Sequence, residues 1–419
     1  MLGGSPKELR PRNRASVLRE VSKSGSISRT KLALETGLSG TAITRITREL
    51  IDSGLLEESE KTPREGVPGR KRTQLTLTSG GPFVIGIGIQ ATDASLVLAN
   101  LRGEIWHRLT IPPEVIADFE KRAVEILPLA DDLLRKFAIR LEEVAGIGVA
   151  VAGAVDPERG FVATAPPLGW SNVPVQSILS RHFDRPISVE NLNNALIAAE
   201  HRFGVGQDRS NLMLFRISYS VGAAFIVEGN VVRGSSFGAG QVGHMPIDGA
   251  SDLCSCGAHG CFNTVASGLA VLADYLGEPY HQIAAADAGS NTGKFLKILE
   301  DSCAGDDRAQ RALFRVGERL GAILKSFTMA FQPELILLSG QVGRNPHFFD
   351  GVRSATDAET RDGGLRSDRV AVTSMSVAQG AVSQALSRFV FSENLAIKSM
   401  PRMRSAIDST APKSMAAGR

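Results

Sequence analysis

The chain has 419 residues, of which 43% are hydrophobic and 22% are charged, and it contains 43 glycines. These values are ordinary for globular proteins, so they argue for a buried core and against global disorder. No apolar run reaches the roughly 18 residues of a membrane span, and no apolar segment of a signal peptide follows the basic N-terminus. Three of the four cysteines stand between Cys254 and Cys261, which is no disulfide framework. The expected location is the cytoplasm.

Positive charge is concentrated at the start of the chain. Residues 1–80 carry 15 Lys and Arg against nine Asp and Glu, whereas residues 81–419 carry a net charge of −3. A basic head on a slightly acidic body suggests that the head meets a polyanion, although a solvated basic surface would give the same count.

The basic head begins with a pattern of short helices. Apolar residues at helical spacing predict a first helix at residues 14–21. Ser28 is a candidate N-cap for a second helix at residues 29–36. Gly37 follows, where a tight turn between helices needs a residue that tolerates positive φ.

A third helix is expected at residues 40–53, with Ser39 as its N-cap. Its inward face is predicted to comprise Ile43, Ile46, Leu50 and Ile51. Its outward face is predicted to comprise Thr41, Thr44, Arg45 and Arg48. Hydroxyl groups and arginines are suited to phosphate and base-edge contacts in a major groove, so this helix is the candidate recognition helix.

A basic hairpin follows the third helix. One strand is expected to begin at residues 54–57, and alternation predicts another at residues 74–78. The polar stretch between them ends in Arg70, Lys71 and Arg72, which could lie against phosphate or enter a minor groove. Together these elements predict a winged helix-turn-helix domain at residues 10–80 that binds double-stranded DNA. The alternative is a small helical bundle with a hairpin and no DNA contact.

From residue 83 the pattern becomes strand-rich. Strands are expected at residues 83–89, 95–100, 104–111 and 144–151, with a helix at residues 119–137. The same order recurs as strands at residues 212–217, 223–228, 231–233 and 335–338, with a helical region at residues 306–331. A meander, a helix and a further strand predict a mixed-sheet α/β fold. The repetition predicts two lobes with a cleft between them.

Cysteine spacing predicts a metal site in the body. Cys254, Cys256 and Cys261 form a C-x-C-x4-C motif, and His244 lies ten residues before it. Thiolates and one imidazole suit a tetrahedral structural zinc with all four positions filled. His259 is a competing ligand, and three buried free cysteines are the alternative. Cys303 is expected to pack as a small hydrophobe.

Several stretches resemble one protein family. They are GFV at residues 160–162, PPLGW at 166–170, VENLN at 189–193, GAGQVGH at 238–244 and CSCGAHGC at 254–261. Over residues 10–395 the chain resembles the ROK family (repressor, open reading frame, kinase). The resemblance implies a two-lobed, actin-like, sugar-kinase-like body at residues 82–395 behind the N-terminal winged helix of the repressor branch. Residues 396–419 are expected to form a mobile tail.

The resemblance also assigns roles to the metal site. The family pattern favours His244 over His259 as the zinc ligand. The zinc of the family braces a loop that carries a sugar-contacting residue. His244 would bind the zinc with one ring nitrogen and could hydrogen-bond a sugar with the other.

Kinase chemistry is not expected. The family's phosphate loop reads D-x-G-G/A-T, but here Gly88 replaces the Asp and Gln90 the first Gly, while Asp93 is expected to be a turn residue. The family's catalytic Asp corresponds to Leu192, which cannot accept a proton. The second phosphate loop reads SYSVG at residues 218–222, with bulk where a phosphate would approach. The chain is therefore predicted not to be an enzyme.

The resemblance implies an effector pocket without carboxylates. Asn191 and His244 match the family, whereas Gln241 and Asn263 replace glutamates. Amides still exchange hydrogen bonds, so the favoured hypothesis is a changed ligand such as a sugar derivative or an anion. The alternative is a vestigial pocket. The favoured function is a sugar-responsive repressor of carbohydrate genes, acting as a homodimer or dimer of dimers. A sugar kinase and a scaffold that binds no DNA are the competing classes.

Overall fold

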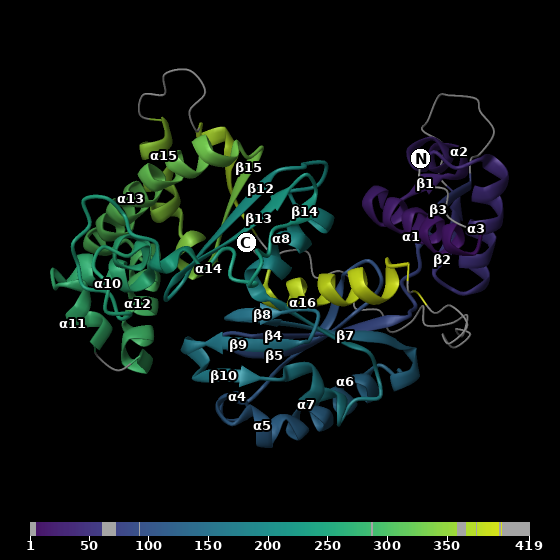
Figure 1. The fold of residues 1–419 in the computed structure, drawn as a ribbon, viewed down its shortest axis with the longest axis horizontal. Coiled ribbons are helices and arrows are strands. Elements are labelled where there is room, and N and C mark those ends of the chain that lie inside the picture. Colours follow the sequence, from purple (N-terminus) through teal and green to yellow (C-terminus); the bar gives the residue numbers. More distant parts are fainter. Residues whose placement is uncertain are drawn as a thin grey trace. The chain divides into compact units, whose positions relative to one another are not determined.

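A computed structural model of the chain describes residues 6–60, 73–91, 93–285, 288–357, 366–373, 375–393 and 395. It mixes helices and strands in two compact units (Figure 1). The first unit combines Met1–Ala195 with Ser376–Arg419, and the second is Leu196–Met375. Among the helices of the described residues, none is long and apolar enough to cross a membrane. The expected tail, residues 396–419, lies outside the described residues.

The N-terminal part of the first unit has the predicted arrangement of helices and wing strands. Its helices are α1 (Pro6–Ser24), α2 (Arg29–Thr36) and α3 (Gly40–Asp52), and its sheet has the order β1 (Ile27–Ser28), β3 (Thr73–Leu77), β2 (Leu56–Glu60). Both predicted caps are confirmed, because the hydroxyl oxygens of Ser28 and Ser39 accept from the N–H groups of Lys31 and Ala42. Gly37 ends α2 at φ 67°.

The core of this domain differs from the prediction at two positions of α3. Ile43, Ile46 and Leu50 are buried as expected, but Ile51 is only partly buried. Thr47 is fully buried instead. Its hydroxyl oxygen accepts a hydrogen bond of 3.1 Å from Arg29 Nε, which satisfies a polar group that burial would otherwise penalise.

A five-stranded sheet forms the centre of the first unit. Its order is β11 (Ile187–Asn191), β7 (Val144–Val151), β4 (Phe83–Ile89), β5 (Ala94–Ala99), β6 (Ile105–Thr110). The β4–β5–β6 meander is antiparallel, and β4, β7 and β11 are parallel. A smaller sheet has the order β10 (Trp170–Val173), β9 (Phe161–Ala165), β8 (Ala154–Asp156). The strands predicted from residue 83 to 151 are therefore confirmed, with ends shifted by one residue at most.

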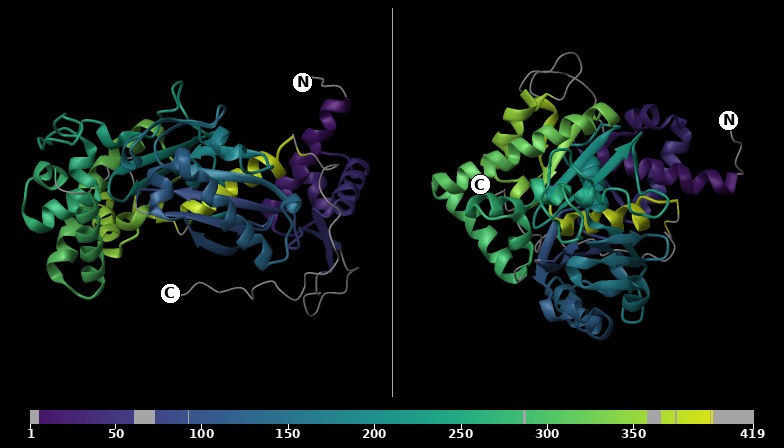
Figure 2. Two further views of the ribbon diagram at one scale, coloured as in Figure 1. Left: turned by 90° about the horizontal axis from the view of Figure 1, so that it is seen from below. Right: turned by 60° about the vertical axis from the view of Figure 1, so that its left-hand side comes forward.

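Helices cover both faces of the five-stranded sheet (Figures 1 and 2). On one face α16 (Val377–Ala385) packs so closely that a Cβ at Gly148 would lie 2.0 Å from the carbonyl oxygen of Ala381. The other face packs against α6 (Ile126–Lys136) and α7 (Val175–Ser180). The remaining helical segments of this unit are α4 (Pro113–Ala117), α5 (Phe119–Arg122), η1 (Ala123–Glu125), η2 (Leu141–Glu143), η3 (Pro166–Leu168) and η6 (Leu386–Val390).

The continuous helix predicted at residues 119–137 is wrong. The chain forms α5, then the 3-10 turn η1, and only then α6. Pro128 explains the break, because proline has no N–H and its ring clashes with the carbonyl group four residues earlier. It is tolerated in the first turn of α6, where N–H groups have no partner within the helix.

The second unit repeats the sheet topology of the first. Its order is β14 (Asn230–Val231), β13 (Val221–Val227), β12 (Leu212–Ile217), β15 (Leu335–Ser339), β16 (Val370–Val372). In chain order, the first strand, β12, is antiparallel to the second, β13, and parallel to the fourth, β15, as β4 is to β5 and β7 in the first unit. The helical segments are η4 (Val242–His244), α9 (Phe262–Ala266), α10 (Gly268–Leu276), α11 (Tyr280–Ala285), α12 (Ala288–Cys303), α13 (Asp307–Phe331), α14 (Gly340–Gly343), α15 (Pro346–Asp357) and η5 (Ser367–Arg369), together with α8 (Leu192–Phe203), whose first four residues belong to the first unit. The predicted duplication is confirmed.

Cys303 does not pack as a small hydrophobe. It is the last residue of α12 and is exposed. Its neighbour Ser302 is buried instead, where its hydroxyl oxygen accepts a hydrogen bond of 2.9 Å from Asn345 Nδ2. The final turn of α12 therefore directs Ser302 inward and Cys303 toward solvent.

Candidate DNA interface and metal centre

The exposed face of α3 carries the predicted recognition residues. Thr41, Thr44, Arg45 and Arg48 are all exposed, on the side of α3 opposite its buried isoleucines. Their spacing of three and four residues places them along one face of the helix. Thr44 donates a hydrogen bond of 2.8 Å to the carbonyl oxygen of Gly40, which turns its hydroxyl group back toward the helix.

The two arginines of this face have no partner among the described residues, unlike Arg10, Arg14 and Arg29. Arg10 and Arg14 both pair with Glu49, at 2.7 and 3.1 Å. Burial raises the pKa of Glu49, but the two guanidinium groups outweigh burial and hold that pKa below its usual value. Arg45 and Arg48 therefore present positive charge that the described structure does not neutralise.

Two acidic residues of β2 are neutralised as well. Glu58 pairs with Arg29 at 2.6 Å, and Glu57 pairs with Arg102 at 2.8 Å. Unpaired carboxylates here would repel DNA phosphates, so these ion pairs favour approach to a polyanion.

The wing is described only in its strands. β2 and β3 pair antiparallel from Leu56 opposite Leu77 to Glu60 opposite Thr73, which confirms the predicted hairpin. The predicted contact residues Arg70, Lys71 and Arg72 lie outside the described residues.

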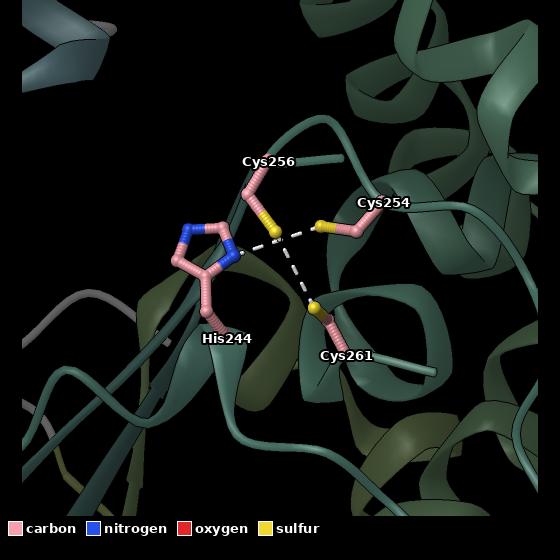
Figure 3. A group of neighbouring side chains, drawn as sticks. All are labelled: His244, Cys254, Cys256 and Cys261. Atoms are coloured by element: carbon pink, nitrogen blue, oxygen red, sulfur yellow. Dashed lines mark hydrogen bonds between the residues drawn. The ribbon is translucent and has the colours of Figure 1, made fainter. Parts of the chain in front are cut away.

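The predicted metal ligands come together in the second unit (Figure 3). His244 Nδ1 lies 3.6 Å from Cys254 Sγ, and Cys256 Sγ lies 3.5 Å from Cys261 Sγ. All four ligand atoms lie within 4.8 Å of one another. Tetrahedral bonds of about 2.0–2.3 Å separate ligand atoms by about 3.3–3.8 Å. The cluster therefore fits a metal ion, with His244 Nε2 turned away from the sulfur atoms (Figure 3).

Two glycines allow the short cysteine loop to turn. Gly257 and Gly260 have φ values of 87° and 71°, and a Cβ at Gly260 would lie 2.4 Å from the carbonyl oxygen of Ala250. His259 lies outside the cluster, because its Nδ1 is 2.8 Å from the carbonyl oxygen of Ser251. Burial raises the pKa of the Cys261 thiol to about 12 when no metal is bound. A bound cation would reverse that preference by deprotonating its ligands.

Asn191, a predicted effector residue, closes β11 in the first unit. Its Nδ2 donates to the carbonyl oxygen of Gly153 at 2.7 Å, and its Oδ1 accepts from the N–H groups of Asn193 and Asn194 at 2.8 and 3.2 Å. The side chain therefore fixes the strand end and the start of α8.

The other predicted effector residues lie in the second unit. Gln241 immediately precedes η4 and His244 ends it; both are exposed, whereas Asn263 in α9 is buried. Asn263 Oδ1 accepts a hydrogen bond of 2.8 Å from the N–H of Val221, which ties α9 to the start of β13. Two of the four predicted residues, Asn191 and Asn263, thus bond to backbone groups with atoms that a ligand would otherwise use.

Close packing or backbone hydrogen bonds involve the residues at the positions where the resemblance predicts kinase residues. A Cβ at Gly88 would lie 3.2 Å from the backbone nitrogen of Ala378 in α16. Leu192 begins α8 and is 3% exposed. Ser218 is buried, and its carbonyl oxygen accepts from Gly268 N–H at 2.7 Å. Asp93 closes the β4–β5 turn by accepting from Gln90 N–H at 2.9 Å, as expected of a turn residue. Gly88 and Leu192 carry no carboxylate for proton abstraction, and the Asp93 carboxylate accepts from Gln90 Nε2 at 2.7 Å.

Family models match both parts of the chain. The ROK family matches residues 84–386. The chain belongs to the ROK family. A second model, winged helix-turn-helix DNA-binding, matches residues 12–57 and so covers α1 to the start of β2.

Relatives of similar length are regulators by name. The xylose repressor of Caldicellulosiruptor bescii is 28% identical over 351 residues, covering 83% of this chain and 86% of the relative. The DNA-binding transcriptional dual regulator NagC of Escherichia coli is 27% identical over 335 residues, covering 79% and 80%.

Solved structures share the fold. A ROK family transcriptional regulator, a homologue of the E. coli MLC protein, matches with a TM-score of 0.72 at 23% identity, covering 94% of this chain and 99% of that one. A ROK family glucokinase from Streptomyces griseus matches with a TM-score of 0.58 at 23% identity, covering 72% and 98%. Regulators and kinases therefore share the ROK body, and the fold by itself does not separate them.

Proposed function

We propose that this chain is a DNA-binding transcriptional regulator whose ROK body senses a sugar or sugar derivative and has no kinase activity. The observation that carries the proposal is the unpartnered pair Arg45 and Arg48 on the exposed face of α3. A winged helix-turn-helix that presents such a face is built to enter a major groove. Leucine at position 192 removes the proton acceptor that a kinase needs.

The names of the relatives support a repressor of carbohydrate uptake or catabolism genes. Helix-turn-helix proteins bind paired half-sites about one helical turn apart, so the working form is a homodimer or a dimer of dimers. Its partner is double-stranded operator DNA, which places it in the cytoplasm. The proposed DNA-binding domain comprises residues 10–80, and the proposed ROK body comprises residues 82–395.

The metal in the proposal is a structural zinc. His244, Cys254, Cys256 and Cys261 would hold it, because three thiolates and one imidazole are ligands that zinc prefers. Four protein ligands leave no position for a reactive water, so the ion would brace the loop and supply no catalysis. It would also fix the orientation of the His244 ring and leave Nε2 free for a ligand.

The effector proposal rests on Asn191, Gln241, His244 and Asn263. All are uncharged polar groups when His244 is neutral, so they would accept a sugar derivative or an anion that carboxylates would repel. A thermal shift panel of sugars and sugar phosphates tests it. A ligand at 100 times its Kd stabilises by about 2.7 kcal/mol. No stabilisation by any compound at millimolar concentration would favour the vestigial pocket.

Loss of Arg45 or Arg48 should weaken selective DNA binding. A duplex is first selected from random DNA with the full wild-type chain, and its affinity is then measured by gel shift. Each alanine substitution should weaken binding by about 5- to 150-fold, because a base contact by an arginine contributes about 1–3 kcal/mol. Arg122→Ala is the matched control, since Arg122 pairs with Glu125 on the surface of the body. Unchanged affinity in both α3 variants would contradict the assigned recognition face.

A kinase assay separates the two activities of the family. The full chain, with hexoses, ATP and magnesium in a coupled ADP assay, should release no more ADP than the same mixture without sugar. Sugar-dependent ADP release would contradict the proposed loss of kinase chemistry. Failure of the wild-type chain to select any duplex would favour the scaffold instead.

A further inference from the structure

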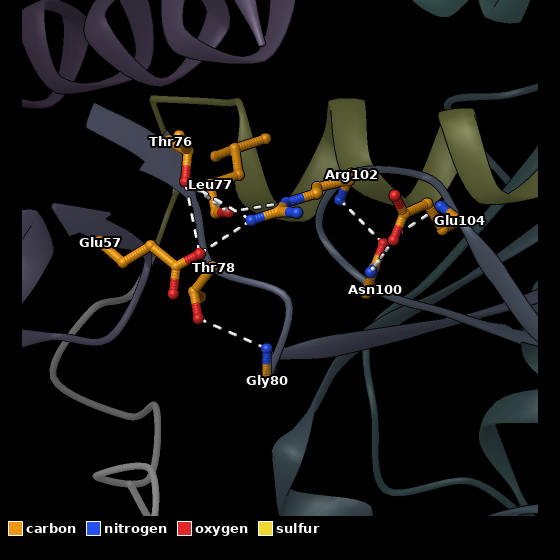
Figure 4. Close-up of polar contacts among 8 residues, drawn as sticks. All are labelled: Glu57, Thr76, Leu77, Thr78, Gly80, Asn100, Arg102 and Glu104. Atoms are coloured by element: carbon orange, nitrogen blue, oxygen red, sulfur yellow. Dashed lines mark hydrogen bonds and ion pairs between the residues drawn. The ribbon is translucent and has the colours of Figure 1, made fainter. Parts of the chain in front are cut away.

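The turn between β5 and β6 is built as a rigid support for one arginine (Figure 4). Asn100 is fully buried, and its Oδ1 accepts from the N–H groups of Arg102 and Glu104 at 3.0 and 3.1 Å. Its Nδ2 donates to Glu104 Oε2 at 2.7 Å, and Gly103 completes the turn at φ 78°. These bonds fix the backbone of Arg102 at the tip of the turn.

The side chain of Arg102 contacts both strands of the wing hairpin (Figure 4). Nη2 lies 2.8 Å from Glu57 Oε1 on β2 and 3.4 Å from Thr76 Oγ1 on β3. Nε donates a hydrogen bond of 2.9 Å to the carbonyl oxygen of Leu77, the last residue of β3. A planar guanidinium group is suited to hold several acceptors in a fixed arrangement.

A second contact joins the DNA-binding domain to the C-terminal part of the first unit. Arg14 in α1 donates from Nη2 to the carbonyl oxygen of Leu395 at 2.7 Å, while its Nη1 pairs with Glu49 at 3.1 Å. Leu395 is buried. Between β3 and β4 only residues 78–82 connect the domain to the body. The body thus contacts the domain through Arg102 at the wing and through Leu395 at α1. These two contacts lie on either side of α3 in the sequence.

We propose that Arg102 is a positioning residue for DNA binding, which holds the wing hairpin β2–β3 against the body so that α3 meets DNA in a fixed orientation. The inference rests on the proposed function. A domain on a five-residue connection would otherwise lose rotational freedom at the moment of binding, and prior fixation removes that cost. Arg102 does this from a turn of the body, without touching DNA.

Arg102 has a second effect that the test must separate. It neutralises Glu57, so removing it also exposes a carboxylate in a domain that approaches phosphates. The Glu57→Gln substitution removes that charge and keeps the shape of the side chain. If positioning is the cause, the double variant Arg102→Ala, Glu57→Gln stays as impaired as Arg102→Ala. Recovery of wild-type affinity in the double variant would overturn positioning in favour of simple repulsion.

The experiment uses the full chain as wild type, Arg102→Ala, Arg102→Lys and the control Arg122→Ala. Hydrogen exchange measured without DNA should be faster in β2, β3 and residues 78–82 of Arg102→Ala, and unchanged elsewhere and in Arg122→Ala. Affinity for the duplex selected by the wild type should fall about fivefold or more, because a domain that is no longer held must lose its rotational freedom on binding. Arg102→Lys keeps the charge but loses the planar guanidinium group, so its affinity should lie between those of the wild type and Arg102→Ala.

Two results would overturn the inference. Exchange in β2 and β3 that matches the Arg122→Ala control would show that Arg102 does not hold the wing. Faster exchange with unchanged affinity would show that its hold has no part in DNA binding. If the wild type selects no duplex, the proposed function fails, while the exchange measurement still decides whether Arg102 holds the hairpin.

Discussion

At Leu192, Gln241 and Asn263, uncharged side chains stand where the resemblance to the ROK family predicts carboxylates. Leucine can neither accept a proton nor bind a hydroxyl group, and here it is buried at the start of α8. Asn263 uses its carbonyl oxygen on the backbone of Val221, which a glutamate could do only by burying a charge. The residues that replace acids therefore serve packing and backbone structure, and only Gln241 remains an exposed polar group.

The metal cluster allows a test by single cysteine substitutions. Cys256→Ala removes a ligand, so zinc content should fall from about one per chain toward zero, and chelation should no longer lower the Tm. Loss of the ion should lower the Tm of the wild type by roughly 5–10 °C, as a loss of about 2–3 kcal/mol predicts for a domain of this size. Elemental analysis and thermal melts measure both effects.

Cys303→Ala is the matched control, since Cys303 is exposed and lies outside the cluster. It should keep its zinc and its Tm. Equal zinc content in the two variants would rule out the assigned ligand set.

Two helices of the second unit cross through close backbone contacts. A Cβ at Gly317 of α13 would lie 2.1 Å from the carbonyl oxygen of Phe348 in α15, and one at Gly351 of α15 would lie 2.1 Å from that of Phe314. Gly321 makes a similar approach, at 2.7 Å from the carbonyl oxygen of Val352. Glycine lowers helix propensity by about 1 kcal/mol relative to alanine, and here it permits the close crossing.

Gly317→Ala should therefore destabilise the chain even though alanine favours helix. Displacing backbone atoms at this crossing should cost about 1–3 kcal/mol in the free energy of unfolding. Gly293→Ala is the matched control, because Gly293 lies in α12 with no atom within 4 Å of the added Cβ, and it should stabilise by about 0.5–1 kcal/mol. Denaturant unfolding measures both, and equal effects would refute the close crossing.

Over the whole molecule, charge is divided between a basic N-terminal domain and a slightly acidic body. Residues 1–80 carry 15 basic against nine acidic residues, although the chain as a whole is only +3. Within that domain Glu49, Glu57 and Glu58 are paired with arginines, which leaves α3 as a locally positive face. The acidic body should repel DNA weakly and so favour approach through the domain alone.

DNA affinity should therefore fall steeply with salt. The slope of log K against log salt concentration should be about −0.9 for each phosphate contacted, and losing one such contact should reduce it by about 1. Arg48→Ala and Arg122→Ala, compared over a potassium chloride series with the selected duplex, measure this. A slope that is equally shallow for wild type and both variants would show that phosphates do not dominate binding.

Local patterns in the sequence determined most of the elements and the metal ligands. Ser28 and Ser39 cap helices by accepting hydrogen bonds from residues three positions ahead. Gly37 ends α2 because it adopts a positive φ, which depends on that residue alone. The C-x-C-x4-C motif brings its sulfur atoms together within one short loop. Such features depend on near neighbours, so spacing was sufficient to predict them. The 3-10 turn before Pro128 was equally local and was predictable from the missing N–H.

Other features were decided by the tertiary structure. Thr47 is buried because Arg29 reaches it, and Asn263 is tied to Val221, 42 residues away in sequence. Arg102 meets Glu57 across 45 positions, and nothing in its local sequence marks that contact. Burial and pairing of this kind depend on which distant segments pack together. The sequence by itself therefore determined the DNA-binding domain, the ROK body and the metal cluster, whereas only the fold decided how the body holds the wing.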